Sequence, residues 1–463
     1  MGRKIKRTLL IMGVVGILVL IVRVSFIVYH YNNAKKIGIH HWTMTEHPFY
    51  SGEKSFEFIT DGTIPVELYL WWNSFGGSIV VSIHDTIGNQ CYISTGGTTD
   101  EDTKLYLEKG KYHMNVVCNN FTGAVAIGYN NITPVVQFPN DRYQIISKDS
   151  KMGFHWDYLL YLPEVRKSNY LLVVPNNTGT VSDLIDIHME KAKDLIIWKS
   201  ELANELGIPL LVPVFPRPNE YEEMYTHALD RATLLSSIEG YKGLDQQLIA
   251  MIDDARMRLF SKGFKTEKKV LLSGFSASGD FTDRFTFLHT DMVRAVSSGG
   301  CDHMVPFAEL NGENLPYPIG IYDYKEITGK EFDLEAFKSI DRFLYKGSLD
   351  EGGWVTITKE DGVQQYTGKE YFEKFEEADL LDELQTLDLP IYQKGDLTEK
   401  EENEISYRAF QGKLYIDRFN VIKEIYEELQ MDHTQFHVYE GIGHEINDQI
   451  IHDEVKFFQE VLY

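Results

Sequence analysis

Cysteines are scarce in this chain. Only Cys91, Cys118 and Cys301 occur among 463 residues, too few for a disulfide framework. A single bridge between Cys91 and Cys118 would require an oxidising compartment, and we do not favour it. The fold must therefore rest on an apolar core, for which a hydrophobic content of 43% is sufficient.

Basic residues are outnumbered, and the motifs of several cofactor enzymes are missing. The chain has 45 Lys and Arg against 69 Asp and Glu, which gives a formal charge of −24. Residues 1–30 contain five of the basic residues and no acidic ones, so the rest of the chain carries −24 − 5 = −29. Such a surface repels phosphate backbones, which excludes nucleic acid as a natural partner. No His-Glu-x-x-His or Cys-x-x-Cys pattern and no glycine-rich phosphate loop occurs, so we expect neither a metal nor an organic cofactor.

The N-terminus has the character of a membrane anchor. Four basic residues among the first seven precede the apolar run from Leu9 to Val22, and Arg23 interrupts it before apolar residues continue to Tyr29. The whole stretch is long enough to cross a bilayer if Arg23 extends toward the interface, and no Ala-x-Ala-like cleavage site follows. We predict an uncleaved, single-pass signal anchor over residues 1–31, with the rest of the chain outside the cell. Cleavage would instead give a secreted protein.

Residues 37–135 alternate apolar and polar side chains in short runs separated by Asp-Gly and Gly-Gly turns. This pattern predicts a small antiparallel β-sandwich, which resembles the accessory jelly-roll or pre-peptidase modules of secreted bacterial enzymes. We expect it to act as a spacer between the membrane and the next domain. Trp71, Trp72 and Phe75 could form a sugar-stacking platform for weak glycan binding, although aromatic residues in sandwich strands more often fill the core.

Residues 150–463 alternate strand and helix patterns, which predicts the α/β class with a mostly parallel sheet. Within this region the apolar run Val270–Leu272 leads into the hexapeptide 274–279, Gly-Phe-Ser-Ala-Ser-Gly. The pattern predicts a nucleophile elbow, in which Ser276 sits on a sharp turn between a strand and a helix. The usual form is Gly-x-Ser-x-Gly, and here Ser278 takes the last position, with Gly279 one step later.

A serine nucleophile needs a general base and an acid that orients the base. Downstream, the strand pattern 343–346 leads to Asp350, and the strand pattern 436–439 leads to His444. Rival acids are Asp302 and Glu351. The rival bases are His433, His437 and His452, of which His437 falls within a predicted strand.

With its order Ser276, Asp350, His444, the chain resembles the α/β-hydrolase superfamily over residues 150–463. The resemblance implies that Ser276 attacks a carbonyl carbon, that His444 takes and returns the proton, and that Asp350 orients the imidazole. It also implies an oxyanion hole. Its donors would be the backbone N–H of Ala277 and one in the loop after an early strand, where Asn177 is our first choice.

Asn176 and Thr178 remain alternative donors in this loop, which departs from the His-Gly-Gly loop of many lipases and esterases. Arg217 and Phe275 are weaker candidates for the substrate pocket. Arg217 could bind a substrate carboxylate, although an ion pair with one of the many acids is the favoured expectation. The acidic stretch 370–404 could cap the site or form a solvated helix.

The sequence thus predicts a membrane-anchored serine hydrolase of the carboxylesterase type, acting outside the cell on a small-molecule or polymeric acyl substrate. Two alternatives stay open. One is a catalytically silent surface protein that binds cell-wall glycan or a protein partner, and the other is a serine peptidase.

Overall fold

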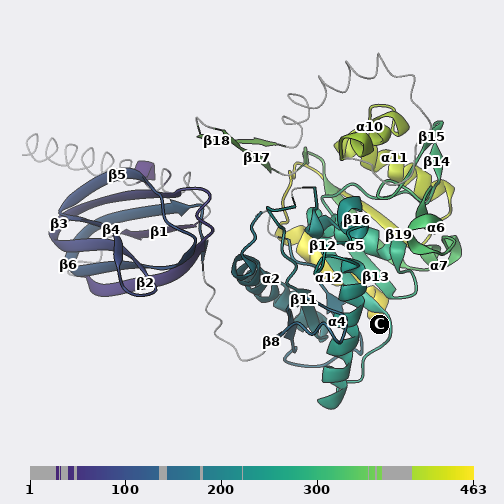
Figure 1. The fold of residues 1–463 in the computed structure, drawn as a ribbon, viewed down its shortest axis with the longest axis horizontal. Coiled ribbons are helices and arrows are strands. Elements are labelled where there is room, and N and C mark those ends of the chain that lie inside the picture. The colour runs from purple at the N-terminus through teal and green to yellow at the C-terminus, as the bar shows by residue number, and fades with distance from the viewer. Residues whose placement is uncertain are drawn as a thin grey trace, which may run out of the picture. The chain divides into compact units, whose positions relative to one another are not determined.

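The computed structural model describes residues 28–30, 32, 40–45, 50–134, 143–177, 181–221, 223–352, 354–359, 362–367 and 399–463. The chain forms two compact units, Met1–Gln137 and Phe138–Tyr463 (Figure 1). The predicted signal anchor over residues 1–31 lies almost wholly outside the described residues. Within the described part of the chain, no helix combines the length and the apolar character needed to cross a membrane.

The first unit is an antiparallel sheet built around two long strands. Its seven strands are β1 (His40–Thr45), β2 (Tyr50–Thr60), β3 (Val66–Asp85), β4 (Gln90–Gly96), β5 (Thr98–Leu105), β6 (Gly110–Asn130) and β7 (Thr133–Pro134). β3 and β6 pair along almost their whole lengths. β5 and β4 lie beside successive parts of β3, and β2 and β1 beside successive parts of β6.

β3 is irregular in its middle, and the two parts on either side of the irregularity contribute to one core. The register of β3 against β6 shifts on both sides of Gly76, and the next residue, Gly77, has φ +75°. A Cβ at Gly77 would lie 2.3 Å from the backbone oxygens of Asn119 and Asn120, so only glycine fits there. Alternate residues from both parts of β3 then share one core: Val66, Leu68, Leu70, Trp72, Ile79, Val81 and Ile83.

The tryptophans of β3 pack inside the first unit and do not form a surface platform. Trp71 and Trp72 are 3% and 0% exposed, so their rings cannot stack against a sugar from solvent. The sugar platform considered from the sequence therefore does not exist as proposed, since only Phe75 of its three members is exposed. The three cysteines are free, and the Cys91–Cys118 bridge is absent.

The second unit is built on an eight-stranded sheet. In spatial order its strands are β19 (Thr434–Tyr439), β16 (Asp341–Gly347), β13 (Val293–Gly299), β12 (Val270–Phe275), β10 (Leu172–Val173), β11 (Leu210–Pro213), β9 (Tyr158–Tyr161) and β8 (Tyr143–Ile146). All neighbours from β19 to β11 are parallel, and β9 is antiparallel to both β11 and β8. This mostly parallel sheet confirms the α/β class predicted from the sequence.

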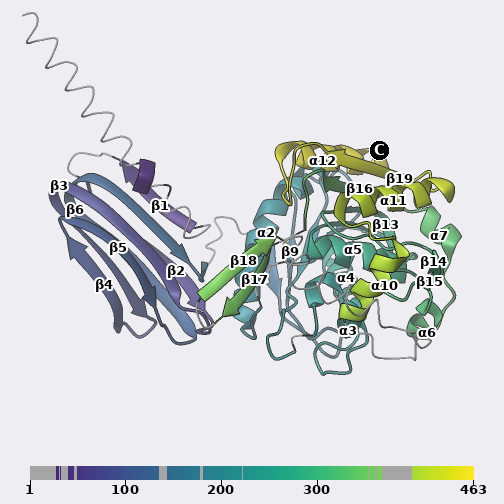
Figure 2. The ribbon, with the colours of Figure 1, turned by 90° about the horizontal axis from the view of Figure 1, so that it is seen from above.

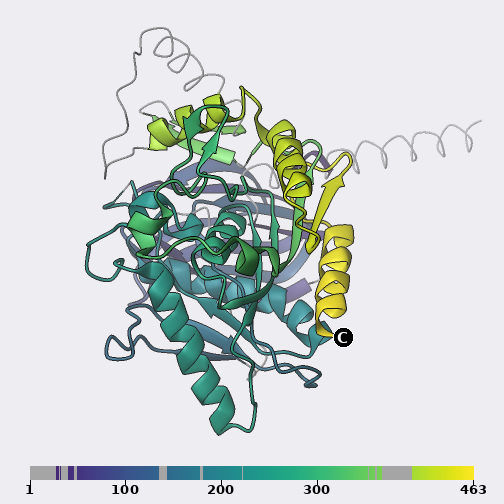
Figure 3. The same ribbon diagram turned by 90° about the vertical axis from the view of Figure 1, so that its right-hand side faces the viewer.

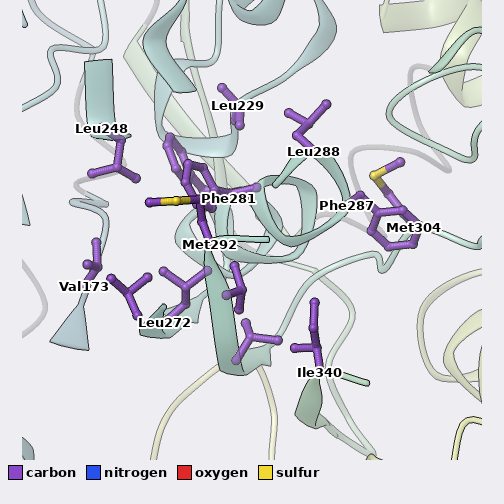
Figure 4. Close-up of a cluster of buried hydrophobic side chains, with 14 of the residues drawn as sticks. Val173, Leu229, Leu248, Leu272, Phe281, Phe287, Leu288, Met292, Met304 and Ile340 are labelled. Atoms are coloured by element: carbon purple, nitrogen blue, oxygen red, sulfur yellow. The ribbon is translucent and has the colours of Figure 1, made fainter. Parts of the chain in front are cut away.

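Helices cover both faces of this sheet. They include α2 (Ile185–Leu206), α4 (Leu244–Ser261), α5 (Ala277–Leu288), α11 (Tyr415–Glu428) and α12 (Asp448–Leu462). Leu271 of β12 joins the core under α2 and α12, the yellow helix beside the C label in Figure 3. Leu272 joins the core under α4, α5 and α11, where Figure 4 shows it in one cluster with Leu248 and Phe281. Because successive strand residues face opposite sides, a strand covered on both faces must be apolar throughout.

Between β16 and β19 the chain leaves the sheet. It first forms a hairpin of β17 (Trp354–Lys359) and β18 (Gly362–Thr367), visible in Figure 2. Most of the acidic stretch 370–404 lies outside the described residues. Its described end begins α10 (Glu399–Ala409), where Glu404 is buried.

A buried polar triangle joins α2, β12 and α12. Lys199 Nζ donates to Ser273 Oγ and to Glu454 Oε2, both at 2.9 Å, and Ser273 Oγ donates to Glu454 Oε1 at 2.6 Å. All three side chains are more than nine-tenths buried. Each charge therefore depends on the other two groups for compensation.

Removing one charge from this triangle should destabilise the second unit. In Lys199→Met the Glu454 carboxylate would remain buried without a cation, and we expect a loss of about 3–5 kcal/mol in the free energy of unfolding, measured by urea denaturation. The double variant Lys199→Met/Glu454→Leu is the control, and it should recover most of that loss. Equal stability of the single variant and the native protein would contradict the prediction.

Candidate active site

Ser276 occupies a strained turn between β12 and α5. Its φ and ψ are 58° and −131°, a region that residues other than glycine rarely adopt. Its N–H donates to Gly299 O at 2.9 Å, and its carbonyl accepts from Asp280 N at 3.0 Å. Hydrogen bonds to β13 and to the first turn of α5 thus keep the backbone of Ser276 in this strained conformation. This is the geometry of a nucleophile elbow, which presents a hydroxyl at the carboxyl edge of the sheet.

Small residues at the elbow let β12 and α5 approach closely. A Cβ at Gly274 would lie 2.1 Å from Ser278 O, and a Cβ at Gly279 would lie 2.6 Å from Gly299 O, so both positions require glycine. Ser278, the irregular residue of the motif, donates its hydroxyl to Phe275 O at 2.9 Å and accepts from Phe275 N at 3.0 Å. Its side chain therefore closes the turn, while Gly279 makes the close contact with β13.

The structure brings Ser276, His444 and Asp350 together from three separate loops. His444 follows β19, and its Nε2 lies 2.9 Å from Ser276 Oγ. Its Nδ1 lies 3.0 Å from Oδ1 of Asp350, which follows β16. Elbow, acid and histidine all lie at the carboxyl edge of one mostly parallel sheet, in the chain order of the α/β-hydrolase fold.

The other candidate histidines lie elsewhere. His433 Nδ1 bonds Asp341 at 2.8 Å. His437 lies within β19 with its ring beside Phe343, and His452 lies in α12. Among the described residues, only His444 hydrogen-bonds the Ser276 hydroxyl.

Asp350 is an ionised carboxylate in a buried place. Burial alone would raise its pKa, but the hydrogen bond from His444 and the charge of Lys346 outweigh burial and lower the pKa below its ordinary value. The backbone N–H of Gly352 donates to the same oxygen, Oδ1, at 3.0 Å. The carboxylate therefore holds the proton of His444 on Nδ1, which leaves Nε2 free to act as a base.

Asp302, the rival acid, serves a different cluster. Its carboxylate lies 3.3 Å from Arg418 and 3.5 Å from Lys346. Desolvation would raise the pKa of Asp302, but these two cations lower it to about 2. Since the two ring nitrogens of His444 are already occupied by Ser276 and Asp350, neither Asp302 nor Glu351 orients this imidazole.

The predicted oxyanion-hole residues adjoin the elbow. Ala277 is the first residue of α5, so its N–H has no acceptor within the helix. The side chain of Asn177 donates to Phe275 O at 3.1 Å, which fixes the loop after β10 beside the elbow. Asn176 is buried and bonds Phe215, and Thr178 lies outside the described residues. Asn177 is thus the residue of the loop that is fastened to the elbow.

The two predicted pocket residues have different surroundings. The ring of Phe275 lies 4.9 Å from the imidazole of His444, centroid to centroid. The guanidinium of Arg217 lies 3.7 Å from the centroid of the Tyr225 ring. The ion pair favoured for Arg217 from the sequence is not found among the described residues, where the guanidinium lies over an aromatic ring.

Two other features bear on what the second unit can bind. A cavity of about 460 Å³ is lined by residues that include Arg166, Tyr170 and Glu267, which precede β10 and β12 and so mark the amino edge of the sheet, opposite Ser276. Among the described residues, no group of three or more His, Cys, Asp and Glu side chains is placed to hold a metal ion.

No known protein-family profile and no curated protein sequence matches this chain. In structure it is similar to poly(aspartic acid) hydrolase-1 from Sphingomonas sp. KT-1, with 13% identity, 68% of this chain and 96% of that chain covered, and a TM-score of 0.37. It is also similar to a poly(3-hydroxybutyrate) depolymerase from Bordetella parapertussis (14% identity, 64% and 82% covered, TM-score 0.32) and to a thermostable esterase (11% identity, 90% and 96% covered, TM-score 0.36). At these values neither activity nor substrate carries over.

Proposed function

We propose that this protein is a serine hydrolase that cleaves an ester or a related acyl bond. One observation carries the proposal: His444 Nε2 lies 2.9 Å from Ser276 Oγ while its Nδ1 lies 3.0 Å from Asp350 Oδ1. These distances suit proton transfer from a nucleophile to an oriented base. Because Ser276 is also held in a strained conformation, the site favours an enzyme over a silent scaffold.

In the proposed mechanism, Ser276 Oγ attacks the carbonyl carbon while His444 Nε2 takes its proton. Collapse of the tetrahedral intermediate breaks the bond to the alcohol, which leaves with that proton. A water molecule, deprotonated by the same nitrogen, then attacks the acyl-serine. The bond to Ser276 Oγ breaks, His444 returns the proton to that oxygen, and the acid is released. The backbone N–H groups of Ala277 and Asn177 would stabilise the oxyanion, together with the dipole at the N-terminus of α5.

The proposed setting is the outer face of a cell membrane. It is supported by the basic flank and apolar run that end near Tyr29, ahead of β1 in the sequence. The first unit would act as a spacer with at most weak glycan contact, and the acidic chain would not bind nucleic acid. Fractionation tests the setting: full-length protein should pellet with membranes and be open to external protease. Recovery in the soluble cytoplasm would contradict it.

A fluorophosphonate probe tests the proposed function directly. Such probes react with activated serine hydroxyls, so mass spectrometry of the labelled protein should find the adduct on Ser276. Labelling at another residue, or none in correctly folded protein, would contradict the proposal. A matched p-nitrophenyl ester and p-nitroanilide would then separate esterase from peptidase activity.

A further inference from the structure

The three-residue segment 215–217, which follows β11, is held by an unusual set of buried polar side chains. Asn176 brackets Phe215: its Oδ1 accepts from Phe215 N at 3.1 Å, and its Nδ2 donates to Phe215 O at 2.7 Å. Nε2 of His227 also donates to Phe215 O, at 2.8 Å. Asn176 and His227 are 1% and 0% exposed, so these bonds are shielded from water.

The next two residues are fixed in the same way. Thr226 Oγ1 donates to Pro216 O at 2.6 Å, and Ser182 N donates to Arg217 O at 2.8 Å. His188 Nε2 lies 2.8 Å from Ser182 O, so the residue that bonds Arg217 O is itself held by a buried histidine. Almost every polar backbone group of residues 215–217 therefore has a buried partner.

The two histidines act here as neutral, fixed groups. Burial lowers the pKa of His227 to about 3 and lowers that of His188, and the charge of Arg217 adds to both shifts. Their hydrogen bonds therefore do not change as the pH moves around neutrality. The hydrogen bonds that hold segment 215–217 are therefore already formed near neutral pH.

The hydrogen bonds to residues 215–217 fix the position from which the side chain of Arg217 extends. Its guanidinium stacks on Tyr225 at 3.7 Å, and within the described part of the chain no carboxylate pairs with it. Two buried arginines of the second unit have acidic partners: Arg231 pairs with Asp323 at 2.6 Å, and Arg418 pairs with Asp302 at 3.3 Å. Arg342, which is also buried, instead donates to backbone carbonyls and lies over the ring of Phe337. Among the described residues, the donors of the Arg217 guanidinium thus have no hydrogen-bond acceptor, although the protein is strongly acidic.

Asp183 is an acid that contacts the chain just after Arg217, and one of its oxygens bonds the backbone. Oδ1 of Asp183 accepts from Asn219 N at 2.8 Å and from Glu220 N at 3.1 Å, which closes the turn that follows Arg217. Asp183 Oδ1 is thus used by the backbone, and no ion pair joins Asp183 to Arg217 among the described residues. Stacking on a tyrosine fixes the plane of a guanidinium while leaving its edge open to a planar anion.

The segment is also linked to the elbow. Asn176, which brackets Phe215, is followed by Asn177, whose side chain bonds Phe275 O one residue before the nucleophile. Arg217 therefore belongs to the carboxyl edge of the sheet and lies a short chain of bonds away from Ser276. An ester bound at Ser276 could extend one end toward this guanidinium.

We propose that Arg217 binds a carboxylate on the substrate, so that the preferred substrates are esters carrying a free carboxyl group on the acyl or the alcohol side. This inference rests on the proposed serine hydrolase activity. The planar fork of arginine pairs with a carboxylate through two parallel hydrogen bonds, and the rigid segment 215–217 places that fork before substrate arrives.

Two pairs of esters test the proposal. On the acyl side, p-nitrophenyl hydrogen adipate is compared with p-nitrophenyl methyl adipate, and on the alcohol side, 4-acetoxybenzoate with its methyl ester. The readout is the ratio of kcat/KM for the charged over the neutral member of each pair. In Arg217→Gln we expect this ratio to fall roughly 10–100-fold in one of the pairs. Arg217→Lys should give an intermediate ratio, because it keeps the charge and loses the fork.

Arg256→Gln is the matched control, since Arg256 lies in α4 and pairs with Asp253 at 3.2 Å. Its ratios should equal those of the native protein. If Arg217→Gln leaves both ratios unchanged while the protein still hydrolyses the esters, the inference is wrong and the proposed function stands. If the native protein hydrolyses none of the esters and takes no fluorophosphonate label, the proposed function itself is wrong.

Discussion

Ser276→Ala should lower kcat by roughly 10⁴–10⁶-fold and abolish fluorophosphonate labelling. The substitution removes the only atom proposed to form the acyl intermediate, and the base His444, 2.9 Å away, would then have no hydroxyl to deprotonate. The fold should persist, because Ser276 is held through its backbone bonds to Gly299 and Asp280. Steady-state kinetics on p-nitrophenyl esters and a thermal melt together measure both effects.

Ser278→Ala is the matched control for this experiment. Among the described residues, its hydroxyl bonds only the backbone of Phe275, so its loss should cost about 1–2 kcal/mol of stability without removing a reacting atom. We expect its kcat to exceed that of Ser276→Ala by at least about 100-fold. If labelling survived in Ser276→Ala and disappeared in Ser278→Ala, the nucleophile would be Ser278, and the assignment of Ser276 would be wrong.

The position of the elbow was predictable because its causes are local. An apolar run that suits a strand buried on both faces ends at Phe275, and the glycines at 274 and 279 fill places where a Cβ would meet backbone atoms. His444 and Asp350 could be predicted for a related reason. Parallel strands bring their carboxyl ends to one edge, so polar residues just after two late strands are expected near the nucleophile.

Contacts between distant segments could not be predicted. Asp302 also follows a strand end, and only the fold shows that Lys346 and Arg418 surround it. In the same way, the abundance of acids favoured an ion pair for Arg217, whereas the chain places Tyr225 against its guanidinium. Such contacts depend on which loops meet above the sheet, and composition does not determine that.

The extent of the first unit's long strands was hidden for another reason. β3 contains an Asn-Ser-Phe-Gly-Gly segment that resembles a turn, yet the chain continues as one strand of 20 residues through it. A register shift beside Gly76 absorbs the irregularity. Local turn signals therefore suggested a break between two strands, where tertiary pairing with β6 produced a bend within one.

Asp350→Asn should lower kcat by roughly 10³–10⁴-fold while the protein stays folded. The buried carboxylate balances the imidazolium that forms when His444 accepts the serine proton, and an amide supplies no such charge. The amide also presents an N–H₂ group to the ring, which favours the tautomer with its proton on Nε2, where it cannot act as base. Kinetics at neutral pH on the same esters measure the loss.

Asp302→Asn separates this role from general electrostatics at the site. It removes a carboxylate that also lies near Lys346, so a purely long-range effect would slow both variants alike. We expect kcat of Asp302→Asn to stay within about tenfold of the native value, with reduced stability because Arg418 loses its ionic partner. Comparable kcat losses in the two variants would contradict the assignment of Asp350.

The pH dependence of stability gives an independent check on Asp350. Its pKa is lowered in the folded chain, so the ionised carboxylate contributes stability above its unfolded pKa of about 4, and this contribution is lost as the pH falls through the folded value. Asp350→Asn cannot titrate, so its melting temperature should decline less steeply than that of the native protein below about pH 4. Parallel acid limbs for the two proteins would show that the carboxylate is not stabilised by His444 and Lys346 as the geometry requires.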